Sequence, residues 1–415
     1  MSITPKLRAS LLATLIGLPL AGLAVLAPST DAVAQQSKDG WRKELADKAQ
    51  QAQAAGQKGN FGEAIRLLKE AKAKAPLSAA EEQGINELLL WAASSTKDHR
   101  LVLQTIDERI ATGRVSGADL ARKLRLKATT HYTLREYREA AAAMNKLAAT
   151  QALNNDDMIL LGNSQMQLRD FRNAAVTLEK AADGAIKTRK ATRTISNLLL
   201  SLHEAYQQTG NDAKRMQTLH RLMVAAPSKD SFKWIASAYE KESARDPVVM
   251  ISIYRLGASR NLLSSEHYAK YAETALDVSS PGEAVAMLEK GMANGAIKKD
   301  DRNNRLLADA KGQVTRVKAT LAQQEAEAKA IATGEPEAKL ATAYFTLKNY
   351  TKASEAAKRG VTKGKLRRPD GLNMLLGIAL AESKNAAAAR NAFKAAAEAN
   401  PKVRGVADLW SSMAG

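Results

Sequence analysis

Two stretches near the C-terminus decide the fold: LATAYFTLKNYTKA at residues 340–353 and LGIALAESKNAAAA at residues 376–389. Each begins with an apolar residue and a small one, and a second small residue follows twelve positions after the first. The two small pairs, Ala341 with Ala353 and Gly377 with Ala389, recur 36 residues apart. Apolar residues at helical spacing surround each small residue, with polar turn residues between. The pattern predicts pairs of short helices that approach closely through small side chains.

The same pairing occurs three more times, at Ala52/Ala64, Ala128/Ala140 and Gly162/Ala174. An aromatic residue stands three positions before the second small residue in four of the copies: Phe61, Tyr137, Phe171 and Tyr350. Aromatic residues make up only 4% of the chain, so their repeated placement at one offset indicates a true internal repeat.

This pattern resembles the tetratricopeptide repeat, a helix–turn–helix unit of about 34 residues. The resemblance implies an all-α fold, an α-solenoid of about eight or nine antiparallel helix pairs wound into a superhelix. Thr333-Gly334-Glu335-Pro336 is the sharpest boundary signal, a helix stop and restart. We therefore predict a segment 1–34 that precedes the fold, an N-terminal array at 35–297, polar linking helices at 298–333, and a C-terminal repeat pair with a capping helix at 334–415.

Composition narrows the classes of function. The 415 residues contain no Cys, which excludes disulfides, thiol catalysis and zinc–thiolate sites. The formal net charge of +19 suggests anionic partners but does not bear on the fold.

The N-terminus reads as a secretory signal peptide. Lys6 and Arg8 precede an almost wholly apolar stretch at 9–27, and Ala32-Val33-Ala34 offers small residues at both cleavage-specificity positions. An uncleaved membrane anchor is the alternative, because the apolar stretch is near the minimum for a span. Such a leader on a chain without Cys predicts the periplasm of a Gram-negative bacterium, and this compartment excludes nucleic acid as a partner.

Motifs for catalysis are missing from the sequence. Five histidines are dispersed, and only His203 and His220 fall on facing helices of one expected repeat. A metal site there, or a hydrolase built on it, is the alternative to ordinary packing histidines, but no third ligand has matching spacing. No glycine-rich phosphate loop follows a strand, and no nucleophile motif is present. We expect a non-enzymatic protein with no catalytic residues, no metal and no cofactor.

In the family that the chain resembles, the first helix of each repeat lines a groove that takes a peptide or a partner helix. Carried over by position, the groove residues are Arg122, Arg125, Tyr132, Asn163, Met166, Thr342 and Phe345. Asn163 stands where the family holds a peptide backbone or a C-terminal carboxylate. Glu204 occupies the matching basic position of the next repeat, which argues against the carboxylate version. A solvated helix face is the alternative for each residue.

Basic residues cluster at two further places, the second of them expected in an exposed loop: Lys187, Arg189, Lys190 and Arg193, then Lys363, Lys365, Arg367 and Arg368. They would suit an anionic glycan or a lipid surface. A solubilising surface is the alternative.

These patterns predict a periplasmic scaffold that binds another protein of the cell envelope by shape and charge. The C-terminal block around Lys365-Leu366-Arg367-Arg368-Pro369-Asp370 is similar to periplasmic repeat proteins of TonB-type energy-transduction systems, which implies an accessory of such a complex. The alternative is an envelope-assembly factor that binds peptidoglycan or polysaccharide through the basic loops. Partner identity, pathway and oligomeric state stay open.

Overall fold

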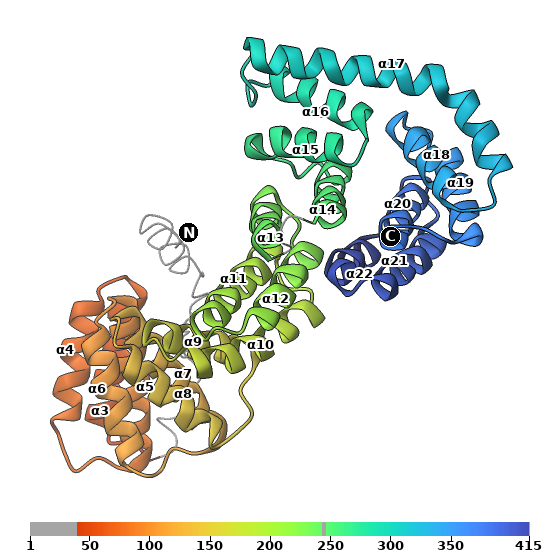
Figure 1. Ribbon diagram of the computed structural model, residues 1–415. Helices are drawn as coiled ribbons and strands as arrows, with labels where there is room; N and C mark the ends of the chain where they lie inside the picture. The colour runs from red at the N-terminus through yellow and green to blue at the C-terminus, as the bar shows by residue number, and fades with distance from the viewer. Residues whose placement is uncertain (1–39, 243–245, 415) are drawn as a thin grey trace. The chain divides into compact units, whose positions relative to one another are not determined.

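The computed structural model describes residues 40–242 and 246–414, and this part contains twenty α-helices, one short 3₁₀-helix and no strand (Figure 1). The predicted all-α solenoid of helix pairs is confirmed. The predicted signal peptide at 1–34 lies outside the described residues. None of the described helices combines the length and the apolar character that a membrane crossing needs.

The helices form two compact units that divide inside α12 (Asp212–Ala225), between Arg215 and Met216. Unit 1 contains, before α12, the helices α3 (Lys43–Gln57), α4 (Phe61–Lys72), α5 (Ala79–Ser95), α6 (His99–Ala111), α7 (Gly117–Thr133), α8 (Tyr137–Ala148), α9 (Asn155–Gln167), α10 (Phe171–Lys187) and α11 (Thr192–Gln208).

Unit 2 continues from α12 to the C-terminus. Its helices are α13 (Lys229–Glu242), α14 (Pro247–Ser259), α15 (Ser265–Asp277), α16 (Pro281–Ala293), α17 (Asp301–Ala330), α18 (Glu335–Thr346), α19 (Tyr350–Lys363), α20 (Pro369–Glu382), α21 (Ala386–Ala399), the 3₁₀-helix η2 (Pro401–Val403) and α22 (Arg404–Met413).

Small residues set the close approach within each pair, as the sequence predicts. The alanines of the five small pairs are all fully buried: Ala52, Ala64, Ala128, Ala140, Ala174, Ala341, Ala353 and Ala389. A Cβ on Gly162 would lie 2.6 Å from Leu178 Cδ2, and a Cβ on Gly377 would lie 2.4 Å from the Phe393 ring. Real Cβ atoms do not pack this closely, so a larger residue at either position would force its neighbour to shift.

The turn inside a repeat has a recurring construction. In the pair α3–α4, Gly59 takes a φ of +81° and Asn60 then caps α4 by accepting a hydrogen bond from Glu63 N at 3.3 Å. In the pair α18–α19, Lys348 takes a φ of +59° and Asn349 caps α19 in the same way. A left-handed residue followed by a side-chain cap ends one helix and starts the next within a few residues.

Within unit 1 the first helices of successive pairs contact one another: α3 contacts α5, α7 contacts α9, and α9 contacts α11. These helices therefore form a face in two parts, α3 with α5 and then α7 with α9 and α11. We call this surface the first-helix face of unit 1.

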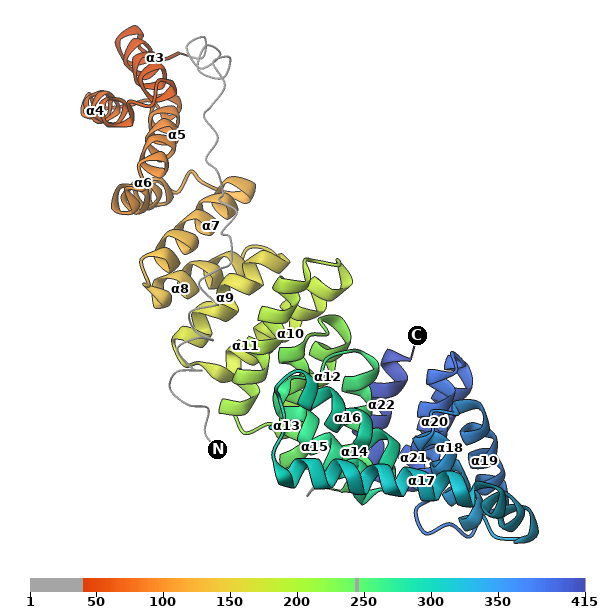
Figure 2. The same ribbon diagram turned by 90° about the horizontal axis from the view of Figure 1, so that it is seen from above.

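Unit 2 bends round until its end meets its beginning. The single 30-residue helix α17 runs from α16 to α18, where the sequence predicts one or two linking helices (Figures 1 and 2). Beyond it, α20, η2 and α22 pack against α14. The Trp410 indole Nε1 donates to the Ser252 carbonyl oxygen at 2.9 Å, across 158 positions of sequence.

This ring closure changes the expected organisation. The sequence places 334–415 in a separate C-terminal block, whereas the structure has these residues in one compact unit with α13–α17. The physical reason is α22, which covers α21 as a capping helix should and also packs on α14.

Candidate functional site

The first-helix face of unit 1 carries the predicted groove residues Arg122 and Arg125, both on α7. Arg122 is exposed and donates to Asp119 Oδ1 at 2.6 Å, one turn earlier on its own helix. Arg125 is half-buried, and its Nε and Nη2 donate to the two oxygens of Asp157 on α9, each at 2.8 Å. Arg122 is thus presented to solvent, whereas Arg125 joins two successive repeats.

Asp157 has two roles at the start of α9. Its carboxylate accepts from Asn154 N at 3.1 Å and Asn154 Oδ1 accepts from Asp157 N at 2.8 Å, which completes a capping box. Asp157 is therefore one of the residues that start α9. The bond to Arg125 was not predicted, because nothing in the local pattern names a partner 32 positions away.

Ion pairs between successive repeats recur along unit 1. Their partners lie roughly one repeat apart in sequence: Arg42–Glu81, Lys72–Glu108, Lys123–Glu87, Arg125–Asp157 and Lys190–Asp156. The Arg42 guanidinium lowers the pKa of the buried Glu81 carboxyl to about 2, because it donates directly to that group. Four of these pairs join a first helix, or a residue just before it, to the first helix of the neighbouring repeat, and Lys72–Glu108 joins the second helices α4 and α6.

The other predicted groove residues of unit 1 are less accessible. Tyr132 is half-buried and packs edge-on against Tyr137 with ring centroids 5.3 Å apart, and this burial raises its pKa to about 12. Asn163 and Met166 on α9 are both buried. Of the groove residues predicted in unit 1, Arg122 is exposed, and Arg125 and Tyr132 are half-buried.

The first predicted basic cluster is a surface feature. Lys187, Arg189, Lys190 and Arg193 are all exposed, where α10 ends and α11 begins. Lys190 approaches Asp156 at 3.4 Å, and the other three form no ion pair within the part of the chain described. We call Lys187, Arg189 and Arg193 the free basic trio.

Two of the four residues in the second predicted basic cluster form ion pairs within unit 2. Lys363 pairs with the buried Glu337 at 3.1 Å and donates to the Ile331 carbonyl oxygen at 3.0 Å, just beyond the end of α17. Arg368 binds Asp246 and Asp370. Lys365 and Arg367 remain exposed, so two charges of the predicted four are available to a partner.

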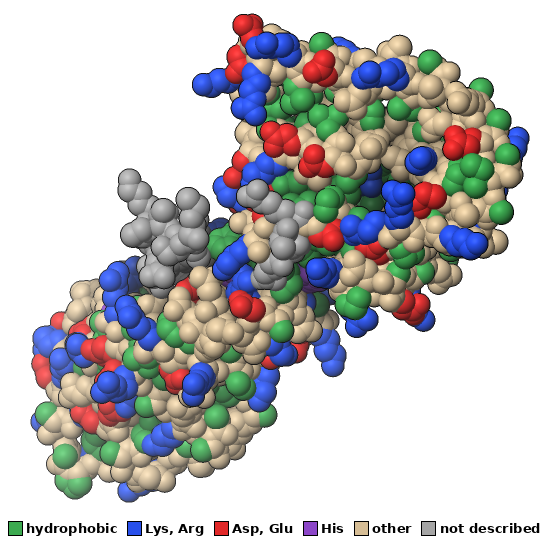
Figure 3. Space-filling model, in the orientation of Figure 1, with side chains coloured by type: hydrophobic (Ala, Val, Ile, Leu, Met, Phe, Trp, Pro, Cys, Tyr) green, Lys and Arg blue, Asp and Glu red, His purple; other side chains and the backbone are tan. Residues whose placement is uncertain are grey.

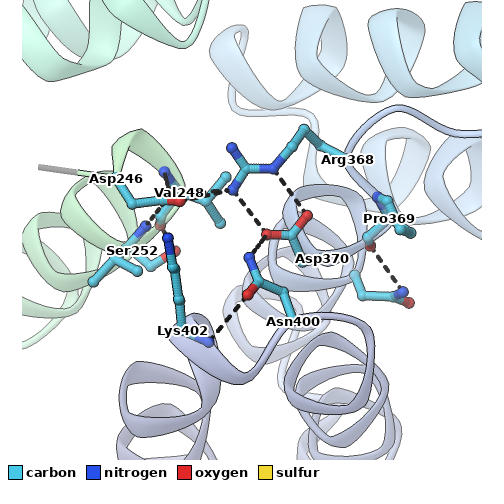
Figure 4. A network of polar contacts seen from close by, with 10 residues as sticks. Asp246, Val248, Ser252, Arg368, Pro369, Asp370, Asn400 and Lys402 are labelled. Atoms are coloured by element: carbon cyan, nitrogen blue, oxygen red, sulfur yellow. Dashed lines mark hydrogen bonds and ion pairs between the residues drawn. The ribbon is translucent and has the colours of Figure 1, made fainter. Parts of the chain in front are cut away.

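Arg368 lies at the centre of the network that closes the ring (Figure 4). Its Nη2 donates to Asp246 Oδ1 at 3.1 Å and to Asp370 Oδ2 at 2.8 Å. Asp246 also caps α14 by accepting from Val248 N at 2.9 Å, and Asn400 Nδ2 donates to Asp370 at 2.9 Å. One guanidinium therefore joins the start of α14, the start of α20 and the end of α21.

A buried ion pair lies inside the ring. Arg255 on α14 and Glu283 on α16 approach to 2.7 Å, and the Tyr271 hydroxyl donates to the same carboxylate at 2.7 Å. Burial alone would raise the pKa of Glu283, but the charge and hydrogen bonds of Arg255 hold it below its ordinary value. The Arg255 guanidinium also lies 4.3 Å from the centroid of the Phe345 ring. Phe345, a predicted groove residue, is consequently buried against α14.

The ring contains a cavity of about 550 Å³ that is half open to solvent, which we call the ring cavity. Its wall comes from α14, the α15–α16 turn, α17, α18, the α19–α20 loop and α20. Thr342, the remaining predicted groove residue, belongs to this wall, so the groove expected on α18 faces this partly open space. In Figure 3, green apolar side chains gather in the recess beside α17.

Of the two histidines singled out by the sequence, His203 is buried and His220 is half-buried. Burial lowers the pKa of His203 and of His220 to about 4 each, so both are neutral at pH 7. His220 Nε2 lies 2.8 Å from the Tyr239 hydroxyl oxygen. Within the described ranges, no group of three or more His, Asp and Glu side chains could hold a metal ion.

Neither a protein-family model nor a curated protein matches the sequence. Among solved structures, a tetratricopeptide repeat protein from Parabacteroides merdae is similar with a TM-score of 0.35 and 14% identity, over 65% of this chain and 100% of the other. The Naa15/Naa10 complex bound to HypK-THB gives a TM-score of 0.41 and 14% identity, over 91% of this chain and 56% of the other. The TPR2AB domain of yeast Sti1 in complex with pHSP90 gives 0.26 and 14% identity, over 72% and 100%. At these identities the comparisons transfer no function to this chain.

Proposed function

We propose that this protein is a non-catalytic scaffold that binds a segment of another protein on the first-helix face of unit 1. The observation that carries the proposal is the construction of that face. The first helices α7, α9 and α11 contact one another in turn, and the bidentate pair Arg125–Asp157 joins α7 to α9. A surface that is already rigid loses little conformational entropy when a partner docks, so more of the interaction energy becomes affinity.

For the partner, we propose a protein of the bacterial cell envelope, with this chain in the periplasm as an accessory of a TonB-type complex. The signal-like segment at 1–34 and the sequence resemblance of the C-terminal block support this assignment. Arg122, which extends from the face, would suit an acidic partner.

Site-specific photocrosslinking in cells tests the proposal. A photoreactive residue replaces Arg122 on the first-helix face, and a matched variant carries it at Val176, an exposed position on the second helix α10. We expect a discrete adduct from position 122 and none of that size from position 176. Mass spectrometry then identifies the adduct.

An envelope transport component in the adduct supports the TonB-type assignment, and a different protein leaves the scaffold but removes that assignment. Identical adducts from both positions, or none from position 122, would overturn docking on this face.

A second candidate function follows from the free basic trio: binding of an anionic envelope glycan. Lys187, Arg189 and Arg193 are exposed at one helix junction without ion-pair partners in the described chain. We expect co-sedimentation with purified peptidoglycan to fall steeply with ionic strength and to be lost on replacing all three with Gln. The matched control replaces Lys365 and Arg367. Equal loss in both variants would indicate net charge alone and contradict a site at the α10–α11 junction.

A further inference from the structure

We propose that the ring cavity of unit 2 binds a small amphiphile with an apolar body and one carboxylate head group. The inference is independent of protein docking on unit 1. It rests on the shape of the cavity, the chemistry of its wall and the state of the three cations that line it.

Just over half of the wall of the cavity is apolar. Its apolar members come from six different parts of unit 2, namely Val248, Ile251, Val278, Val317, Ala338, Ala343, Leu366, Leu372, Met374 and Leu375. A volume of about 550 Å³ falls within the ordinary range for small-molecule sites, about 300–1,000 Å³. An apolar body that fills this space removes wall and ligand surface from water. Each Å² of apolar surface buried in this way stabilises the complex by about 25 cal/mol.

The polar part of the wall favours a single negative charge. Three cations line the cavity, but two are already committed. Arg255 is paired with Glu283, and Arg368 is paired with Asp370 and Asp246. The third, Lys339 on α18, forms no ion pair within the described residues. A carboxylate placed beside Lys339 would gain a charge-assisted bond without displacing an existing partner.

One carboxylate also belongs to the wall and limits the charge that the site accepts. Glu335 lies one turn before Lys339 on α18, and its Oε2 accepts from the Arg367 backbone N–H at 3.2 Å. A ligand with several negative charges would therefore be repelled, whereas a monoanion beside Lys339 is balanced.

The ring closure makes the cavity pre-formed. Gly371 on α20 approaches α14 so closely that its added Cβ would lie 3.2 Å from Val248 Cγ2. On the opposite side, the Gly282 backbone N–H of α16 donates to Thr346 Oγ1 at 2.6 Å. Contacts between elements far apart in sequence hold the wall in place before any ligand arrives, which lowers the entropy lost on binding.

Binding of decanoate to the purified chain, measured by titration calorimetry below the micelle concentration, tests the proposal. Decan-1-ol serves as the uncharged analogue. We expect one saturable site per chain and an affinity for decanoate about tenfold above that for decan-1-ol, since one charge-assisted bond contributes about 1.5 kcal/mol.

Three variants assign the site. Lys339→Met removes the ammonium group and keeps the side-chain length, so it should remove the preference for decanoate while decan-1-ol still binds. Lys358→Met, an exposed lysine on α19, is the matched control and should leave both affinities unchanged. Ala338→Phe narrows the cavity and should weaken both ligands more than tenfold, with circular dichroism confirming the fold.

The proposal is overturned if neither ligand binds saturably, if Lys339→Met keeps the full preference, or if a folded Ala338→Phe binds both ligands like the parent. Loss of the preference in Lys358→Met as well would indicate net charge and not the cavity.

Discussion

Units 1 and 2 are built from the same helix pairs but use them differently. In unit 1 the helices that pack closely lie at most two apart along the chain, so contacts are local. In unit 2, α14 also packs on α20, η2 and α22, so the same repeat chemistry closes on itself. The difference lies in a few residues that join distant elements, chiefly Trp410 and Arg368. Small-residue pairing thus determines the repeat, and the closing contacts determine whether a stack stays open.

The largest effect is expected from removing Trp410, the aromatic residue that closes the ring of unit 2. Trp410 is 2% exposed, stacks on Phe393 and bonds to Ser252. Trp410→Ala should cost about 3–5 kcal/mol through the cavity it leaves. Hydrogen exchange should show lost protection throughout unit 2 and unchanged protection in unit 1. Trp410→Phe, which keeps a ring but loses the hydrogen bond, should cost much less. If only α22 loses protection after Trp410→Ala, the closure does not stabilise the ring.

Two glycine-to-valine variants, one in each unit, compare how much the helix pairs of units 1 and 2 are destabilised by an added side chain. Gly162→Val in unit 1 meets the flexible Leu178 side chain, and Gly377→Val in unit 2 meets the rigid Phe393 ring. Overpacking costs about 1–3 kcal/mol, and we expect the unit 2 variant at the upper end because an aromatic ring has less freedom to move. Urea unfolding followed by circular dichroism measures both. A larger loss for Gly162→Val would contradict the idea that the ring tolerates less displacement.

Units 1 and 2 should respond differently to acid, because they contain different ionisable groups whose pKa values are shifted by folding. His203 and His220 both have a folded pKa of about 4, below the unfolded value, so each stabilises its unit above pH 6.5 and this stability is lost as pH falls toward 4. Glu81, with a folded pKa of about 2, adds stability in unit 1 that is lost between about pH 4.5 and 2.

Hydrogen exchange at several pH values should therefore show both units weakening between pH 6.5 and 4, and unit 1 weakening further below pH 4.5. Glu81→Gln should remove the lower step. If it leaves the acid profile of unit 1 unchanged, the Arg42 pair is not its origin.

The smallest expected effect concerns the ion pairs between repeats of unit 1. Arg125→Met should cost about 1 kcal/mol, because the bidentate pair with Asp157 is only partly shielded from water. Its effect should shrink with added salt, whereas the effect of Trp410→Ala should not. The control Arg122→Met removes a pair within one helix and should change stability by less. An effect of Arg125→Met that does not depend on salt would indicate lost packing, not lost charge.

The sequence was sufficient for the repeats because their determinants are local. Each small pair and its aromatic neighbour lie within one helix pair, and all five predicted small pairs are buried in the structure. The closed ring was not predicted, since Trp410 and Ser252 are 158 positions apart and each fits an ordinary helix.

One signal of the ring was available in the sequence. Arg255 interrupts the otherwise apolar helix VVMISIYRLG (248–257), which indicates a charge with a buried partner. The ring cavity and Lys339 had no such signal, because a cavity wall drawn from six separate segments leaves no spacing to recognise. The basic residues at 363–368 show the same limit: composition located them in a loop, but not the acids that two of them bind.

The packing of α22 on α14 limits how the number of repeats in this chain is able to change during evolution. Repeat proteins commonly diverge by gaining or losing whole units, because each unit meets only its neighbours. Duplication of a helix pair is compatible with that freedom in unit 1. In unit 2 an extra pair would carry Trp410 away from Ser252, so length there is fixed and variation is confined to substitutions on the wall. One polypeptide thus combines unit 1, which tolerates a change in the number of its repeats, with unit 2, which does not.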